Sequence, residues 1–257
     1  MISIISPTTT MNFDKDIKID QFSKPFFYDD IEYLTSILKS LSIDEVSNLM
    51  NLSLDLSSLN HERYSKLGSN DNPNKQSILA FDGEVFNCMN VSNFDNGDIE
   101  FSNNHLRILS GLYGILKPLD LIEPYRLEMK SKLNNKDGKD LYKFWKSKIT
   151  NYLISELDKQ SNNTLVNLAS SEYLKCIDLK LLCQSHNFVD IVFKEYYPLK
   201  DTYTVKGLYA KKARGYMVSY IVKNKIDNVD DLKKFDVEGY SFNDTLSTSN
   251  TYVFTRS

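Results

Sequence analysis

Apolar residues recur along this chain either at helical spacing or in short continuous runs. The helical spacing predicts helices over residues 29–40, 54–66, 97–105, 140–157, 213–222 and 229–235. Ser42 with Glu45 forms a capping-box pattern, which predicts one more helix start. The apolar runs predict strands before Pro7 and over residues 78–81, 165–169, 188–193, 202–210 and 252–254. Strands and helices without regular alternation favour a single α+β domain over residues 1–257 rather than a doubly wound sheet.

Residues 106–129 combine apolar positions with residues that interrupt helices. Gly111, Gly114, Pro118 and Pro124 exclude one long helix, yet the nine leucines and isoleucines of residues 106–122 require burial. Because ordinary loops are polar and lie on the surface, this segment is expected to run through or along the core. Its polar side chains are then expected to point toward an interaction partner. They are Arg107, Lys117, Asp120, Tyr125, Arg126 and Glu128.

Composition points to an ordinary soluble protein. Hydrophobic residues make up 41% and charged residues 25% of the 257 positions, and no apolar run approaches the ~20 residues of a membrane-spanning helix. The first residues lack the basic lead and the long apolar stretch of a signal peptide. Three widely spaced cysteines fit a reducing compartment. We therefore expect a cytoplasmic location and no membrane contact.

The net charge of −3 hides a division along the chain. Residues 1–104 hold 7 basic and 16 acidic residues, residues 105–223 hold 20 and 12, and residues 224–257 hold 4 and 6. A basic middle within an acidic frame is what a groove for a polyanion requires, since phosphate binding depends on local positive charge. A lysine-rich face in contact only with water is the alternative interpretation.

Two short patterns are typical of phosphate contacts. The basic run Lys211, Lys212 and Arg214 lies where a predicted strand passes into a helix, and backbone N–H groups at a helix start bind anions. Gly111 and Gly114 leave no side chain in the way of a phosphate. A basic turn in water and an ordinary glycine turn are the respective structural alternatives.

Other patterns exclude several classes of site. Neither a Walker loop nor a Gly-x-Gly-x-x-Gly fingerprint is present, so no nucleotide cofactor is indicated. The histidines and cysteines lack the spacing of metal ligands, so we expect no metal. Glu128 and Glu172 adjoin apolar segments that raise a carboxyl pKa, which suits general acid or base work. Structural pairing with an arginine such as Arg126 is the other interpretation.

The order of these motifs resembles the YaaA family of bacterial peroxide-stress proteins. The resemblance rests on residues 106–129 and on shorter motifs nearly end to end, among them Ile5-Ser6-Pro7, Arg63-Tyr64, Phe144-Trp145, Asn167-Leu168-Ala169-Ser170, Glu172-Tyr173 and Tyr209–Gly215. One departure is Thr9, where the family commonly has a lysine.

The resemblance implies a cytoplasmic protein of unusual mixed topology that binds DNA in a basic cleft, and that limits oxidative damage and free iron during peroxide stress. It also implies a helix-hairpin-helix element, which we expect at residues 106–129. Such elements grip the backbone of double-stranded DNA without reading its sequence. The expected DNA-binding residues are Arg107, Gly111, Gly114, Lys117, Arg126, Lys211, Lys212 and Arg214.

An enzymatic function is the main alternative. A base-excising or base-modifying enzyme acting on nucleic acid or a nucleotide would use Glu128 or Glu172 beside the same phosphate grip. Direct iron sequestration is a third possibility, but it needs a carboxylate or histidine cluster that the sequence does not show.

Overall fold

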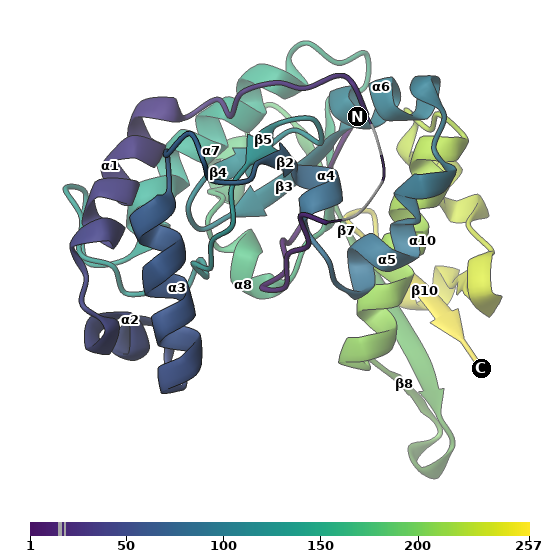
Figure 1. Cartoon of the computed structure of the whole chain (residues 1–257). Coiled ribbons are helices and arrows are strands. Elements are labelled where there is room, and N and C mark those ends of the chain that lie inside the picture. The colour runs from purple at the N-terminus through teal and green to yellow at the C-terminus, as the bar shows by residue number, and fades with distance from the viewer. Residues whose placement is uncertain (15–16, 18) are drawn as a thin grey trace.

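The centre of the protein is a mixed β-sheet (Figure 1). In the computed structural model, which describes residues 1–14, 17 and 19–257, the strand order is β4-β3-β1-β6-β7-β10-β9, with β8 beside β7. The strands are β1 (Ile2–Ile5), β3 (Leu106–Ser110), β4 (Gly114–Leu116), β6 (Thr164–Leu168), β7 (Asn187–Tyr197), β8 (Thr202–Thr204), β9 (Ser241–Phe242) and β10 (Thr251–Arg256). A separate pair joins β2 (Lys75–Gln76) to β5 (Leu121–Ile122).

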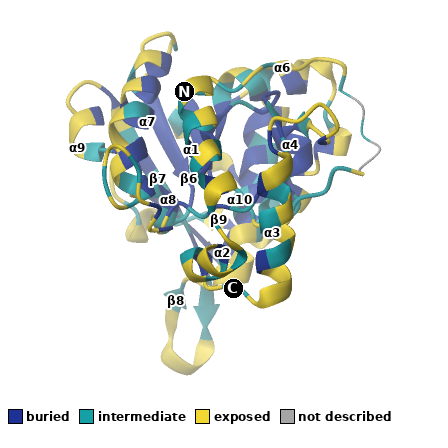
Figure 2. Cartoon of the chain, turned by 60° about the vertical axis from the view of Figure 1, so that its left-hand side comes forward, coloured by how far each residue is buried: buried dark blue, intermediate teal, exposed yellow. Residues whose placement is uncertain are grey.

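Five neighbouring strands, β3, β1, β6, β7 and β10, run parallel. Parallel sheets are covered on both faces, so their strands are buried throughout. All residues of β1, β3 and β6 are buried accordingly, and Figure 2 shows the interior strands in the buried colour. Strands β4, β8 and β9 are antiparallel additions. The expected fold class, α+β, is confirmed.

Helices surround this sheet in separate groups (Figure 1). One group, α1, α2 and α3, lies to one side, whereas α5 packs against α10 on the other. The helices are α1 (Tyr28–Ser40), α2 (Ile43–Met50), α3 (Leu54–Lys66), α4 (Ser77–Ala80), α5 (Glu84–Met89), α6 (Asn96–His105), α7 (Leu141–Leu157), α8 (Ser171–Leu174), α9 (Leu179–Leu182) and α10 (Gly207–Lys223). Short 3₁₀ turns are η1 (Val91–Asn93), η2 (Pro198–Lys200), η3 (Val229–Lys234), η4 (Val237–Gly239) and η5 (Asp244–Leu246).

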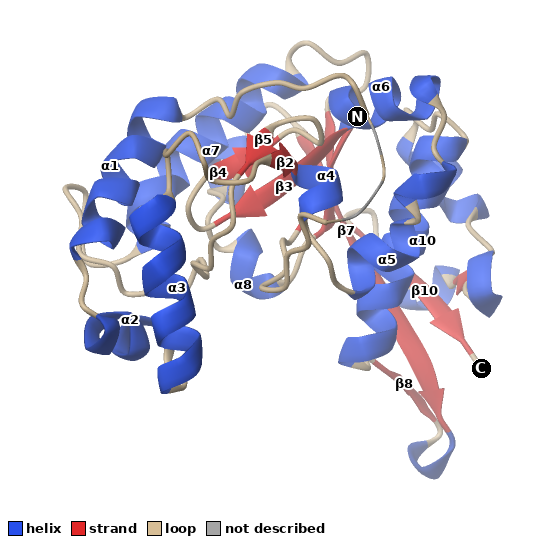
Figure 3. Ribbon diagram, in the orientation of Figure 1, coloured by secondary structure: helices blue, strands red, loops and turns tan. Residues whose placement is uncertain are grey.

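Residues 106–129 form strands and turns, so the helix-hairpin-helix expected there is not present. All of this segment is described, and it contains β3, a turn, β4 and β5 (Figure 3). Gly114 has a φ of +70°, and a Cβ built on it would lie 2.7 Å from the ring of Trp145. The Trp145 Nε1 in turn donates a hydrogen bond of 2.9 Å to the Gly111 carbonyl oxygen. The two glycines therefore close a buried β-turn under α7.

Two other elements differ from the sequence prediction. Residues 78–81 belong mainly to helix α4 rather than to a strand, because the backbone N–H groups of Ser77 and Ile78 bond to Asp120 and Pro118 across the chain. Strand β8 ends at Thr204, and α10 begins at Gly207, six residues before the predicted start at Ala213. The Lys211–Arg214 run thus lies within α10 rather than at the strand-to-helix passage, a correction to its expected position.

Replacing Gly111 by alanine is expected to lower the free energy of unfolding by about 1–3 kcal/mol, the usual cost of overpacking. The new Cβ would lie 2.2 Å from the carbonyl oxygen of Leu127, and a backbone atom yields little. Urea unfolding measures the change. Gly207→Ala is the matched control, because nothing lies within 4 Å of its Cβ position. Equal stability of the two variants would contradict the close approach.

Candidate functional site at the carboxyl ends of the parallel strands

The chain connections that leave β1 and β6 run toward opposite sides of the sheet. These strands are neighbours, but the chain proceeds from β1 to β3 on one side, and from β6 to β7 on the other. Loops that leave adjacent parallel strands in opposite directions open a space at the carboxyl ends, and ligands of such sheets bind there. This position, here called the switch point, is therefore the candidate ligand-binding region of the sheet.

Two serines meet at the switch point. Ser6 follows β1 and Ser170 follows β6, and their Oγ atoms are 3.2 Å apart. The Ser170 backbone N–H also donates to the Ser6 Oγ at 2.8 Å. Ser170 stands at the start of α8, as the sequence predicts, but its side chain makes no capping hydrogen bond. The hydroxyl groups instead join the two diverging loops.

Residues 126–130 run along the β3 side of the switch point. Gly111, just after β3, touches the Leu127 backbone, and this contact places Arg126 and Glu128 beside the strand end. Lys130 Nζ lies 3.2 Å from Glu128 and 3.5 Å from Glu172. Both candidate acid–base residues are thus ion-paired to one lysine. That arrangement favours the structural interpretation over a general acid or base.

On the other side of the switch point, Asp190 of β7 accepts a hydrogen bond of 2.7 Å from Asn167 of β6. Burial raises the pKa of Asp190, against the opposing effects of Asn167 and the nearby Arg214. Arg214 comes from α10, and burial lowers its pKa despite the charge of Asp190. A cation, an amide and a carboxylate therefore gather beside the end of β6.

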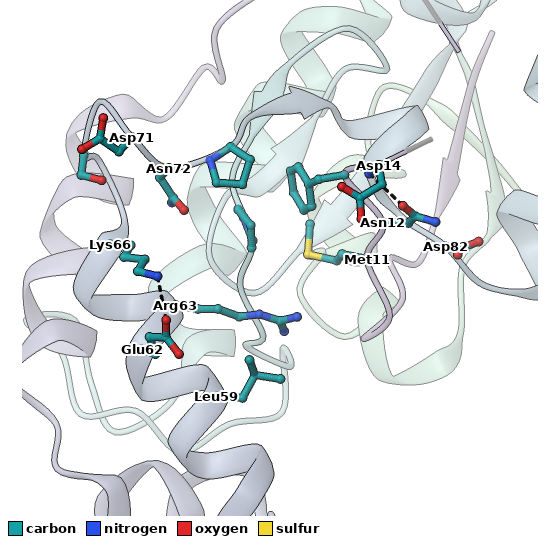
Figure 4. Close-up of a pocket in the computed structure, with 14 residues that line it drawn as sticks. Met11, Asn12, Asp14, Leu59, Glu62, Arg63, Lys66, Asp71, Asn72 and Asp82 are labelled. Carbon is teal, nitrogen blue, oxygen red and sulfur yellow. Dashed lines mark hydrogen bonds and ion pairs between the residues drawn. The ribbon is translucent and has the colours of Figure 1, made fainter. Parts of the chain in front are cut away.

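A third arginine, Arg63, projects from α3 into a pocket of about 730 Å³ (Figure 4). Burial lowers its pKa, and the charge of Arg126 lowers it further, so the two guanidinium groups are close. Tyr64 fixes this arrangement by donating a hydrogen bond to the Arg126 carbonyl oxygen. Arg63 is not among the site residues predicted from the sequence, although the Arg63-Tyr64 motif contributes to the family resemblance. Its signal was the helical spacing of the buried polar face Ser57, Asn60 and Tyr64.

Arg63, Arg126 and Arg214, here called the edge arginines, share incomplete pairing. Among the described residues, no carboxylate lies within 4.0 Å of Arg63 or Arg214, and Arg126 has only Glu128 at 3.8 Å. The Nε atoms of Arg126 and Arg214 are buried without a hydrogen-bond partner in that same set. Buried cations in proteins are normally paired. The edge arginines are half-buried, and Arg63 donates a hydrogen bond of 3.3 Å to Asn60, so the open Nε groups of Arg126 and Arg214 are what indicate a site for an anion.

Lys211 and Lys212 extend this positive region along α10. Lys211 is exposed, and Lys212 Nζ lies 3.8 Å from Glu84 at the start of α5. The neighbouring Gly83 touches Thr8, which follows β1. The basic run is therefore linked by direct contacts to the loop that leaves the switch point. Together with Arg126, the structure thus brings four of the predicted DNA-binding cations to one edge of the sheet.

Arg107 lies elsewhere, and its predicted DNA contact is wrong because its side chain is enclosed. Lys117 lies near Arg107, but its side chain is 36% exposed, so its predicted DNA contact stays a prediction. Arg107 is 1% exposed; its Nη2 donates to Glu156 at 2.6 Å, and its Nε donates to Tyr152 at 3.2 Å. Lys117 Nζ lies 3.7 Å from the same carboxylate. Arg107 is enclosed by protein, so it stabilises the packing of α7 against the sheet. Gly111 and Gly114 are likewise buried and cannot touch a phosphate.

Acid is expected to weaken the fold through Glu156. Burial acts to raise the pKa of its carboxyl, but hydrogen bonds from Lys159 and Arg107 outweigh burial and hold the pKa at about 2. A carboxyl with a depressed pKa stabilises the folded protein above its unfolded pKa, near 4.5. Stability should therefore fall between pH 4.5 and about 2. Urea unfolding across this range, compared with Glu156→Gln, measures it; an identical pH dependence in both proteins would contradict this.

Comparison with known proteins identifies the family. The family model described as "Peroxide stress protein YaaA" matches residues 1–246. The chain belongs to the YaaA family. A UPF0246 protein of Clostridium botulinum is 44% identical over 256 residues, covering 99% of both chains. A UPF0246 protein of Acaryochloris marina is 45% identical over 258 residues and covers all of both chains, and one of Alteromonas mediterranea is 39% identical over 258 residues, covering 100% and 98%. The predicted resemblance is confirmed.

Two kinds of feature are absent from the described part of this YaaA-family chain. In the described residues, no helix has the length and apolar character to cross a bilayer. Over the same residues, no group of three or more histidine, cysteine, aspartate or glutamate side chains is arranged to hold a metal ion.

Proposed function

We propose that this YaaA-family protein binds double-stranded DNA without sequence preference, through the carboxyl edge of its sheet, during peroxide stress. The observation that carries the proposal is the incomplete pairing of the edge arginines. Phosphate oxygens accept the hydrogen bonds that these guanidinium groups lack, and arginine forks match phosphate geometry. Lys211 and Lys212 supply further charge on the adjoining helix.

The proposed contact set differs from the sequence expectation. It keeps Arg126, Lys211, Lys212 and Arg214, adds Arg63, and omits Arg107, Lys117 and the two buried glycines. The five cations come from α3, the segment after β5 and α10. Arg126 follows the end of β3 through the Gly111–Leu127 contact, and Arg214 lies near Asp190 of β7. Contacts of this kind position a duplex without reading bases, since phosphates are the same in every sequence.

Binding of this kind offers a route to less oxidative damage. Lysine and arginine that bind phosphates release the counterions condensed on the duplex. Iron(II) associated with the DNA backbone is among the displaced ions, so less iron remains at the DNA to react with peroxide. The protection needs no iron site in the protein.

Salt dependence tests the proposal. Each phosphate contact contributes roughly −0.9 to the slope of log K against log salt concentration. For five contacts on a 30-base-pair duplex we therefore expect a slope of about −4.5. Lys211→Ala/Lys212→Ala should make this slope shallower by about 1.8. Lys233→Ala/Lys234→Ala is the matched control, because those adjacent lysines pair with Asp230 and Asp231 in η3. A slope near zero for the unaltered protein would overturn the proposal.

The enzymatic alternative has less support. Glu128 and Glu172 are both held by Lys130, whereas a general acid or base must be available to a substrate. Incubation with duplex containing oxidised bases separates the two functions. We expect retained binding and no released base; base release that disappears in Glu128→Gln or Glu172→Gln would favour the enzyme.

A further inference from the structure

The hairpin formed by β7 and β8 projects past the switch-point edge (Figure 1). Pairing between β6 and β7 reaches only Asp190, but β7 continues for seven residues to Tyr197. At ~3.3 Å per residue, this extension is about 23 Å long. Strand β10 accompanies β7 as far as Glu195, so the last part is supported by β8 alone. Residues 194–206 are here called the arm.

Contacts within the arm give it a fixed shape. Tyr196 and Tyr203 are directly opposite across the two strands, with ring centroids 5.5 Å apart. The Tyr196 hydroxyl donates to Asp201 at 2.7 Å and holds the turn. Lys206 Nζ lies 5.3 Å from the ring of Tyr197, the last residue of β7. Cross-strand aromatic pairs stabilise hairpins, so the tip is held away from the body.

The tip is apolar. Pro198 is exposed, and Leu199 is 85% exposed, more than any other large apolar side chain among the described residues. Figure 2 shows this end of the hairpin in the exposed colour. A single exposed leucine is unremarkable on a flat surface. At the end of a stiff arm, next to Pro198, the Leu199 side chain exposes its apolar surface to water and gains no packing in the free protein.

The surroundings of the tip are basic. Residues 194–214, the arm and the first turns of α10, hold six lysines and arginines against two acidic residues. One of those acids, Glu195, is paired with Arg256 at 3.0 Å. The arm itself holds three lysines and two acidic residues, and the remaining three cations belong to α10. An exposed apolar tip beside these cations suits a polyanion with a stacked apolar interior. Duplex DNA has both properties.

We propose that the arm enters the minor groove of bound DNA and that Leu199, backed by Pro198, wedges between two base pairs and kinks the duplex. Apolar wedges of leucine or proline open base steps in this way and bend DNA by 20–90°. The inference rests on the proposed DNA binding: the edge arginines hold the backbone while the arm deforms the duplex beside them. Flexible pyrimidine–purine steps are the sites where such a kink costs least.

Two measurements on one duplex test the wedge separately from binding. A 30-base-pair duplex with a fluorophore at each end reports its end-to-end distance, and anisotropy reports affinity. The unaltered protein should shorten the distance at saturation. Leu199→Ser should still bind at saturating concentrations but leave the duplex straight, whereas Leu54→Ser, a control at a leucine 68% exposed on α3, should bend it fully.

A fluorescent variant gives direct evidence of insertion. The single native tryptophan, Trp145, is fully buried, so Leu199→Trp adds one reporter at the tip. Stacking between bases should quench its emission on DNA, and vesicles of anionic lipid should leave it unchanged. A straight duplex at saturation, full bending by Leu199→Ser, or a response to vesicles but not to DNA would each overturn the wedge. Absence of any duplex binding by the unaltered protein would instead overturn the proposed function.

Discussion

Replacing Arg126 and Arg214 together by glutamine is expected to weaken duplex binding on the order of 100-fold. Each hydrogen bond to a charged group contributes about 1.5–3 kcal/mol, and two such contacts are lost. The free energy of unfolding should stay constant or rise, because the change removes two half-buried cations that have incomplete pairing in the free protein. Residues held for binding at a cost in stability behave in this way.

Fluorescence anisotropy and urea unfolding on the same preparations measure both quantities. Lys130→Gln is a control for loss of a nearby cation, since Lys130 is already paired with Glu128 and Glu172. Unchanged affinity in the double variant would remove the edge arginines from the interface. A large loss of stability would show that they support the fold instead.

Replacing Arg107 by methionine is expected to have the opposite pattern. Its guanidinium is buried with Glu156 and makes hydrogen bonds of 2.6–3.2 Å to Glu156, Tyr152 and two backbone carbonyls. Breaking a buried ion pair costs about 3–5 kcal/mol because one charge is left without its partner. Lys159 and Lys117 remain near Glu156, so the expected loss of stability lies at the lower end of this range. Duplex affinity of the folded fraction should not change.

The matched control for Arg107 is Lys66→Met, which removes an exposed pair with Glu62 on α3. Such i,i+4 pairs contribute about 0.5 kcal/mol or less. Urea unfolding should therefore separate the two variants clearly. Weakened DNA binding by folded Arg107→Met would return Arg107 to the candidate interface.

Helix boundaries were predictable where apolar spacing and a capping residue coincide. The capping box of Ser42 and Glu45 begins α2, and α3 spans the predicted residues 54–66. Residues 78–81 were not predictable, because four apolar residues suit a buried strand and a buried helix turn equally. Long-range bonds from Ser77 and Ile78 decide the outcome, and a local pattern does not contain them.

The candidate site was predictable in part. The basic middle of the chain predicts an anionic ligand, which stays a prediction, and charge counts do not distinguish an enclosed cation from an available one. Arg107 is flanked by Leu106 and Ile108 in a strand that is buried on both faces, whereas Arg126 follows the last strand of the segment. The switch point itself depends on strand order, which brings Ser6 and Ser170 together over 164 residues of sequence. Local periodicity carries no information about that order.

The central place of β1 has a consequence for how the protein is made. Its apolar residues have no neighbour until β3 is synthesised, and the second neighbour, β6, ends at Leu168. At about 5–20 residues per second, the ribosome completes β6 roughly 8–30 s after β1. During that interval at least one edge of the Ile2–Ile5 strand lacks its neighbour and is available to other chains. Early engagement by a chaperone would therefore protect the strand around which the rest of the sheet is assembled.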